Sequence, residues 1–217
     1  AGNITLTSQN ESLNVGNSTV SSTSLGGTGQ AGEISLLGQA INFIGSLLNV
    51  ETASTDDSNS PANITLDGQG GDIVLSKVVA GLETQGLTAS TSGAANAGSI
   101  RIENVAALTL DGVAVLSEAL AGSTGNAGDI SVNTTGAISL SNGTNIATST
   151  DGSGFAGQIV MTGSSVTGDN VTIASQATQT NSGQAGSITI TGDTVAFTGG
   201  SELSTATNSD LVTPSAG

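Results

Sequence analysis

Two neighbouring acids, Asp56 and Asp57, are the residues whose types and spacing come nearest to a catalytic arrangement. Hydrolysis of a glycosidic bond uses a pair of carboxylates at a defined separation. This pair lies in a stretch of Ser, Asp, Asn and Pro, however, and a charged, solvated loop is the ordinary interpretation of such a stretch. The sequence therefore favours a surface loop over a glycosidase site.

Other catalytic chemistry has few residues to draw on. The chain contains no His and no Cys, so it has neither an imidazole base nor a thiol nucleophile. Polysaccharide lyases need basic groups, and the only two here, Lys77 and Arg101, are 24 residues apart. We predict that the protein is not an enzyme, with no catalytic residues and no cofactor-binding residues.

Calcium is the one metal that the composition suggests. The stretch GQGGDIVL, Gly68–Leu75, partly matches the Gly-Gly-x-Gly-x-Asp repeat of calcium-binding β-rolls, but it is solitary, whereas those sites need tandem copies. Asp72 and Asp129 are expected at one position of the repeat, and Glu33 and Gln158 at the same one, a mixture that argues against a dedicated site. We predict no metal ligands, and Ca²⁺ is the alternative.

The charge balance excludes two classes of partner. Seventeen acidic and two basic residues give a net charge of −15. Phosphate backbones and anionic membrane surfaces both require basic patches, so we expect no nucleic acid and no membrane insertion, and no run of 18 apolar residues is present.

A repeat organises the chain. A small residue, Gly, a polar residue and Ile, then alternation, recur as AGNITL, AGEISL, GGDIVL, AGSIRI, AGDISV, AGQIVM and AGSITI. The repeats start near residues 1, 31, 70, 97, 127, 156 and 185, and the long second repeat carries an apparent insertion, Asn59–Gly68. Their isoleucines are expected to stack as one ladder: Ile4, Ile34, Ile73, Ile100, Ile130, Ile159 and Ile188.

Each repeat holds three short apolar-x-apolar segments separated by Gly turns, and no segment shows a helical period. Strands this short are stable only when they pair with equivalents in neighbouring repeats. The sequence thus predicts an all-β chain, 1–217, forming one right-handed parallel β-helix (a β-solenoid) of about seven coils. Gly at each coil start is expected to turn a corner or to permit close backbone approach.

The three Phe residues and the Ser/Thr segments also have expected positions in the coil. Phe43 and Phe197 are expected in the core, and Phe155 at a corner. Ser/Thr segments recur at similar coil positions and would stack into a flat Ser/Thr face, the kind of surface that ice-binding solenoids use, although Thr is also an ordinary strand residue. These segments are 20–24, 52–55, 88–92, 147–150 and 204–207.

Repeats such as GNAGDISVNTTGAISLSNGTNIATSTDGSGFAGQI, Gly125–Ile159, resemble the β-helical part of filamentous haemagglutinin-like exoproteins, above all large cyanobacterial members with tandem GNAGxIxI repeats. The resemblance covers essentially the whole chain. It implies two-partner secretion, a long right-handed β-helix and a surface adhesin role, and it supplies no catalytic motif.

The functional expectation is a structural or adhesive module of an exported cell-surface protein or extracellular filament, with host-surface or matrix glycans as possible partners. The alternatives are a carbohydrate-binding or polysaccharide-cleaving β-helix and an ice-binding solenoid. Ala1–Gly2 and Ala216–Gly217 each open a repeat, so both ends are expected to be open coils. Either the chain is part of a longer solenoid, or copies associate end to end through their coils.

Overall fold

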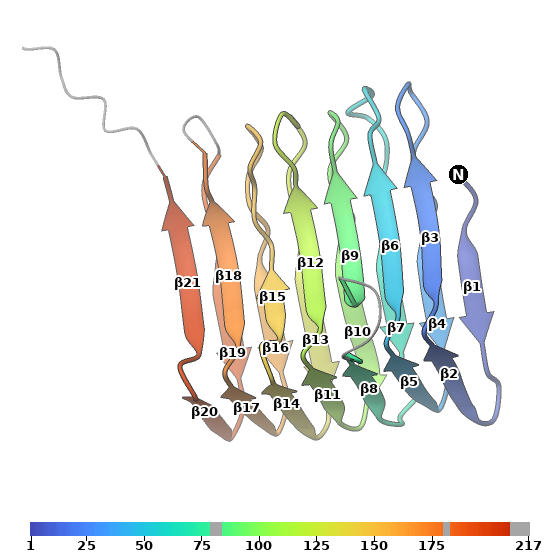
Figure 1. Cartoon of the computed structure of the whole chain (residues 1–217), viewed down its shortest axis with the longest axis vertical. Coiled ribbons are helices and arrows are strands. Elements are labelled where there is room, and N and C mark those ends of the chain that lie inside the picture. Colours follow the sequence, from blue (N-terminus) through green and yellow to red (C-terminus); the bar gives the residue numbers. More distant parts are fainter. Residues whose placement is uncertain (79–83, 180–182, 209–217) are drawn as a thin grey trace, which may run out of the picture.

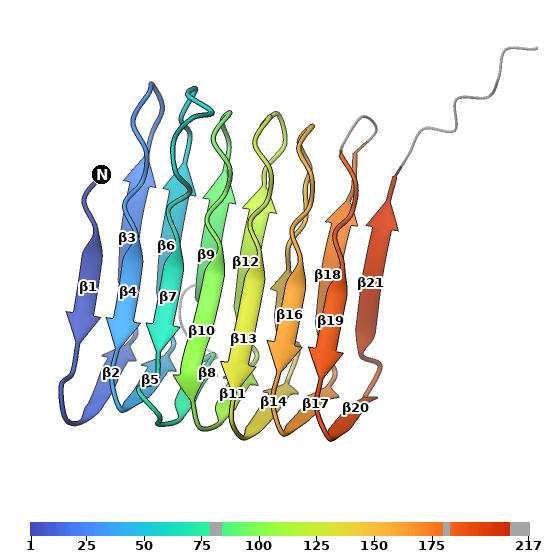
Figure 2. The ribbon, with the colours of Figure 1, turned by 180° about the vertical axis from the view of Figure 1, so that it is seen from behind.

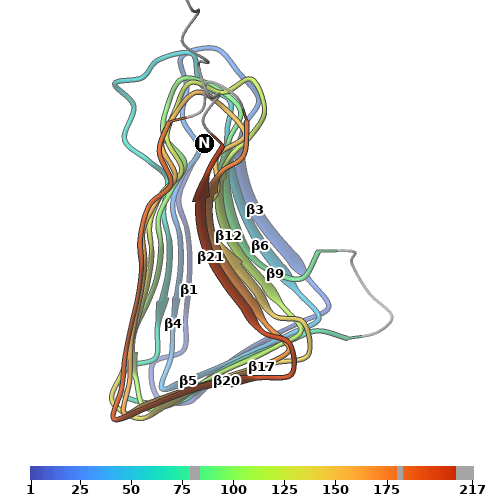
Figure 3. The same ribbon diagram turned by 90° about the vertical axis from the view of Figure 1, so that its left-hand side faces the viewer.

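The chain folds as a single stack of coils. The computed structural model describes residues 1–78, 84–179 and 183–208. These residues form 21 strands and no helix, with three strands in each of seven coils. Figure 3 looks along the stack from its C-terminal end, and there the chain runs anticlockwise toward the viewer, which makes the coil right-handed. The predicted right-handed β-solenoid is confirmed.

Three parallel sheets make the walls, and each contains one strand from every coil. Sheet A consists of β1 (Ile4–Thr7), β4 (Ile34–Leu37), β7 (Ile64–Asp67), β10 (Ile100–Val105), β13 (Ile130–Thr134), β16 (Ile159–Thr162) and β19 (Ile188–Thr191). Sheet B consists of β2 (Ser12–Gly16), β5 (Ala40–Ile44), β8 (Ile73–Ser76), β11 (Leu108–Asp111), β14 (Ala137–Ser141), β17 (Ser165–Asp169) and β20 (Thr194–Thr198). Sheet C consists of β3 (Thr19–Ser24), β6 (Leu47–Thr52), β9 (Gly86–Thr91), β12 (Ala114–Ala119), β15 (Asn145–Ala147), β18 (Thr172–Ala177) and β21 (Glu202–Thr207).

The cross-section is a narrow triangle (Figure 3). Sheet B is its base, and sheets A and C converge toward an apex from which the loops joining C to A project. Inward side chains alternate with outward ones along each strand, as the period of a β-strand requires. The inward aliphatic side chains stack between the three walls, and Phe43 among them is 1% exposed, as predicted.

The third coil corrects the predicted repeat. Ile73 lies in sheet B, paired with Ile41 and Leu108, and it does not belong to the isoleucine ladder. Ile64 takes that place, because it pairs with Ile34 on one side and Ile100 on the other. The third repeat therefore begins before β7 and not near residue 70. The ladder spacings become 30, 30, 36, 30, 29 and 29 residues.

The predicted insertion at Asn59–Gly68 is also wrong, because this range contains the core strand β7. The extra residues lie at 77–85, between β8 and β9, where other coils turn from sheet B to sheet C in two or three residues. The motif GGDIVL at Gly70 resembles a coil start because two different corners require glycine before an apolar strand. Gly71 sits where a Cβ would lie 1.2 Å from the carbonyl oxygen of Gln39, so this corner also demands Gly before an apolar strand.

In most coils the opening glycine permits close approach of the backbone and does not make a left-handed turn. The exceptions are the first coil, where Gly2 has open space, and the third, where Ala62 takes this position. A Cβ at Gly98 would lie 1.7 Å from the carbonyl oxygen of Ala62 in the coil before it, and one at Gly157 would lie 2.0 Å from that of Gly128. Neither residue has a positive φ. Left-handed residues occur instead at the corner between sheets B and C, where Gly112 (φ 67°) and Asn142 (φ 56°) are examples.

Candidate functional site

Asp56 and Asp57, the adjacent acids considered in the sequence, lie in the loop that joins β6 to β7 at the apex of the triangle. Asp56 accepts hydrogen bonds from the backbone N–H and the hydroxyl of Ser58, at 3.0 and 2.6 Å. These bonds lower the pKa of the Asp56 carboxyl below its usual value. A depressed pKa keeps this group ionised, which is the opposite of what a general acid needs.

The two basic residues do not meet. Lys77 follows β8 on the sheet B side, whereas Arg101 lies on the outer face of β10 in sheet A. Arg101 borders a small hollow of about 160 Å³ with Asp129 and Gln158, and Lys77 borders a separate one with Asp111 and Asn142. The structure thus brings no pair of bases onto one surface.

The acids of the predicted calcium position are separated as well. Asp129 precedes β13 in sheet A, and its carboxylate accepts the backbone N–H of Gln158 at 2.7 Å. Asp72 precedes β8 in sheet B and accepts the backbone N–H of Ala107, so the expectation that Asp72 and Asp129 share a position is wrong. Within residues 1–78, 84–179 and 183–208, no three carboxylates gather closely enough to hold a metal ion.

The Ser/Thr segments do not build a flat outer face. They lie along sheet C and just beyond it, and seven of their 17 hydroxyl residues are buried, among them Ser22, Thr91 and Thr150. Ser22 accepts the N–H of Gly32, and Thr91 donates to the carbonyl of Ala95. Outward positions of sheet C include Leu, Ala and Glu beside Ser and Thr, so the predicted hydroxyl array is interrupted.

One pair of acids could not be found from sequence spacing. Glu118 on the outer face of β12 has a raised pKa, first because the group is partly buried and second because the charge of Asp151 lies near it. Glu118 borders a groove of about 310 Å³ with Leu47 and Leu116, whereas Asp151 borders a different hollow of about 420 Å³. The two carboxyls therefore do not line one common cleft, and a substrate bound in one hollow would meet only one of them.

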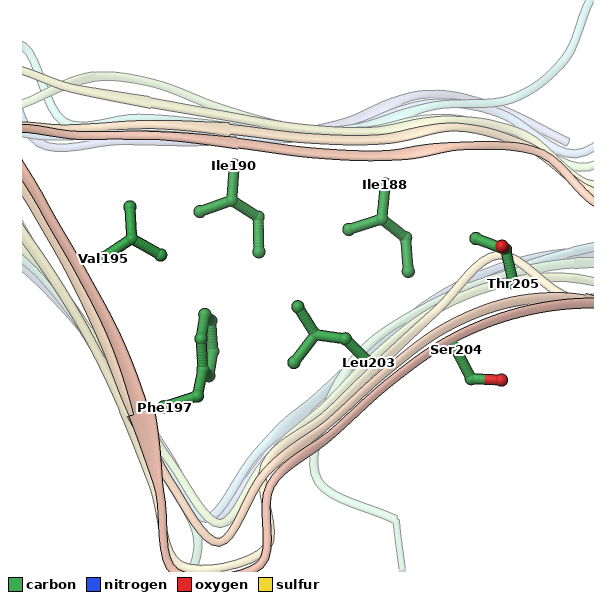
Figure 4. A pocket seen from close by; sticks show the side chains of 7 residues that line it. All are labelled: Ile188, Ile190, Val195, Phe197, Leu203, Ser204 and Thr205. Atoms are coloured by element: carbon green, nitrogen blue, oxygen red, sulfur yellow. The ribbon is translucent and has the colours of Figure 1, made fainter.

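An apolar hollow lies against the last described coil, β19 to β21. Its volume is about 330 Å³, and Figure 4 shows side chains of all three walls pointing into it. Val195 and Leu203 are 46% and 45% exposed, whereas their partners in the coil before, Val166 and Ile173, are fully buried. The lining residues are Ile188, Ile190, Val195, Phe197, Leu203, Ser204 and Thr205.

The first coil, β1 to β3, is also less buried than the coils that follow it. The inward aliphatic residues of β1, β2 and β3 are only partly buried, although they pack against the core. These residues are Ile4, Leu6, Leu13, Val15 and Val20. The other two aromatic residues lie where they were expected: Phe197 is partly buried and packs against the core, and Phe155, 55% exposed, lies at the corner between sheets C and A. The inward aliphatic residues of the first and the last described coils are thus less buried than those of the coils between them. Ala216–Gly217, which were expected to open a further coil, lie outside the described residues.

Comparisons with known proteins gave no match of this chain to a family model, to a curated protein or to a solved structure. None of the described residues forms a helix that could cross a membrane.

Proposed function

We propose that this chain is a structural and adhesive module of an exported cell-surface protein or extracellular fibre, and that it carries out no catalysis. The observation that carries the proposal is the way in which the core is built. Strand contacts run overwhelmingly between neighbouring coils, so the apolar interior continues along the stack. Each added coil lengthens such a rod without changing the coils already present.

The surface supports a spacer more than a binding cleft. The described carboxylates are spread over three sheets and the apex loops, and the two bases lie on different sheets. The net charge of −15 favours a soluble, extended particle. The sequence resemblance to filamentous haemagglutinin-like exoproteins points to the same role and to a location outside the cell.

The alternatives have weaker support. A carbohydrate-cleaving β-helix needs two carboxyls on one cleft, whereas Glu118 and Asp151 border different hollows. An ice-binding face needs a regular hydroxyl array, whereas the outward residues of β6 in sheet C are Leu47, Asn49 and Glu51. A binding role toward surface or matrix glycans remains compatible with a spacer and forms the adhesive part of the proposal.

The spacer role is tested by location and by length. Antibodies raised against the chain should label intact cells that produce it, and labelling that requires permeabilised cells would contradict export. Fusions of one, two and three tandem copies to an outer-surface anchor should move a terminal gold label outward by about 35 Å per copy, given a strand spacing of about 4.8 Å and seven coils. A constant distance would contradict the spacer.

The adhesive role is tested with beads that carry the purified chain, presented to immobilised glycans and matrix proteins. Beads that carry a variant with a broken core, Ile130→Asp, are the control. Retention that depends on the folded chain supports adhesion, and equal retention of both bead types contradicts it.

A further inference from the structure

The groove on the outer face of sheet C contains a carboxylate without a partner. Glu118 points outward from β12 and is partly buried, yet its carboxyl group has no hydrogen bond and no ion pair to any residue that the structure describes. The burial and then the nearby charge of Asp151 raise its pKa. Taking a charge out of water without a compensating partner is costly, so this carboxylate would be stabilised by a cation that enters the groove.

The groove follows β9, because the outward side chains of this strand are shorter than those of its neighbours. Thr88 and Ser90 of β9 pair in register with Leu116 and Glu118 of β12, and Leu47 of β6 borders the hollow on the other side. Figure 3 shows that sheet C bends so that its outer face is concave. The three strands belong to inner coils, and each of them pairs with a strand on both sides. The shape of the groove therefore does not depend on where the chain begins or ends.

The lining combines apolar walls with a single charge. Leu47, Leu116 and Leu120 supply the walls, and Glu118 supplies the charge. A lysine side chain matches both features, because its methylene stem packs along apolar surface while its ammonium group stays near water. Leu116 and Glu118 are two residues apart on one face of β12, which places their Cα atoms about 6.6 Å apart, a distance that the lysine side chain can span.

Other occupants fit this groove less well. Calcium takes six to eight oxygen ligands, usually with several carboxylates, whereas Glu118 is the one acid among the described residues that line the groove. The same lining has no aromatic residue on which a sugar ring could stack. The volume of about 310 Å³ lies at the lower end of the range for ligand sites, about 300–1,000 Å³, which suits one side chain better than a polymer.

The surroundings also favour a positive ligand from another molecule. The strands of sheet C contain Glu51, Glu118 and Glu202 but no Lys or Arg. The only two bases of the chain, Lys77 and Arg101, do not line the groove. The net charge of −15 attracts a basic partner and repels a second copy of this chain.

We propose that the groove along β9 binds a lysine side chain of a basic protein or peptide, with the stem against Leu47 and Leu116 and the ammonium group on Glu118. This inference goes beyond the structural and adhesive role, because it assigns a site and a protein partner. It is also independent of that role, since neither export nor adhesion to glycans is needed for the groove to bind.

Peptide titrations followed by NMR through the methyl signals of Leu47 and Leu116 test the chemistry of the groove. The probes are Gly/Ser peptides, blocked at both ends, whose one central residue is lysine, norleucine or 2,3-diaminopropionic acid. Norleucine keeps the stem without the charge, and diaminopropionic acid keeps the charge without the stem. The lysine peptide should bind saturably and at least fivefold more tightly than the other two. Equal binding of either control peptide would overturn the proposal.

Matched variants test the place of binding. Glu118→Gln removes the charge of the groove, whereas Glu51→Gln removes an equal charge from the same face of sheet C outside the groove. Both residues are register partners of Ser90, so the two changes lie in one column of the sheet. Glu118→Gln should weaken binding of the lysine peptide at least tenfold, and Glu51→Gln less than twofold. Equal effects of the two variants would show attraction by net charge alone and would contradict a site at Glu118.

A second pair of variants tests the apolar wall. Leu116→Thr shortens the wall with a residue that suits a strand, and it should weaken binding of the lysine peptide at least threefold. Leu37→Thr, at an outward position of sheet A, is the control and should leave the affinity unchanged. Light scattering of the chain alone completes the test: self-association that is lost in Glu118→Gln would assign the groove to a second copy and not to a basic partner.

Discussion

The ring of Phe197 occupies the space that a side chain at Gly168 would need. The two residues are register partners in sheet B, and a Cβ at position 168 would lie 2.4 Å from ring atom Cδ1. Other coils have an aliphatic or aromatic side chain in this column, for example Leu140 in the fifth coil. The ring of Phe197 in the seventh coil thus fills the space beside Gly168 in the sixth, where a larger residue at position 168 would clash with it.

Gly168→Leu should therefore destabilise the chain by about 1–3 kcal/mol, which is the usual cost of overpacking a core. The double variant Gly168→Leu/Phe197→Ala should recover much of that loss, because the ring and the added side chain compete for the same volume. Urea unfolding of the two single variants and the double variant measures the coupling. Additive losses would show that the two side chains do not share this space.

A carboxylate in the isoleucine ladder should unfold its coil. Ile100 and Ile130 are 0% and 1% exposed, and an unpaired buried charge costs several kcal/mol. Ile100→Asp and Ile130→Asp should each lower the free energy of unfolding by that order, as measured by thermal melting. Ser131→Asp, on the outer side of the same strand, is the control and should change stability little. Unchanged melting of both isoleucine variants would refute the register of sheet A.

Alanine at a coil-opening glycine should also be costly. At Gly98 the obstacle is backbone, the carbonyl of Ala62, which cannot rotate away as a side chain can. We expect Gly98→Ala to destabilise the chain by about 1–3 kcal/mol, and Gly29→Ala to leave it unchanged. Chemical denaturation of the two variants side by side provides the measurement, and similar values would remove close approach as the reason for the motif.

The raised pKa of Glu118 predicts a pH effect with a definite sign. Because the folded chain holds this proton more tightly than the unfolded chain, the contribution of Glu118 to stability is fully present below the ordinary carboxyl range and is lost as the pH rises through the raised pKa. Glu118→Gln should therefore stabilise the chain at pH 7, and the gain should vanish below about pH 4. Glu51→Gln on the same face controls for the loss of a carboxylate. A destabilised Glu118→Gln at pH 7 would reverse the assigned sign.

We expect no turnover of neutral or acidic polysaccharides. The adjacent acids Asp56 and Asp57 lie in an apex loop, and the hydrogen bonds from Ser58 favour the ionised form of Asp56. Reducing-end and unsaturated-product assays with the purified chain measure hydrolysis and elimination. Activity that disappears in Asp56→Asn, Asp57→Asn or Glu118→Gln would identify an enzyme.

Periodicity was enough to predict the class of fold, because an aliphatic residue at every second position leaves few ways to bury three short strands per repeat. It was not enough for the third coil. Gly71 and Gly98 are both required by a nearby carbonyl, so the local pattern around Ile73 looks like a coil start although its partners are Ile41 and Leu108. Register is decided by pairing between coils, which a local motif does not contain.

The surface was harder to predict than the core. Whether a hydroxyl of sheet C points inward depends on one step of strand register, which is why Ser22 and Thr150 are buried and not part of an outer array. Glu118 lies on β12 and Asp151 lies in the loop after β15 of the next coil, and no repeated spacing in the sequence indicates that their charges interact.

The nine residues between β8 and β9 show what the corner between sheets B and C tolerates. Both strands keep their register with the coils on either side, although neighbouring corners are much shorter. Length at this corner is therefore free to vary, while the strands that flank it are fixed. A foreign peptide could be grafted there or at the equivalent corner of any inner coil. Copies grafted at several corners would be displayed at intervals set by the spacing of the coils. The solenoid would then hold epitopes or binding peptides at fixed distances along a line.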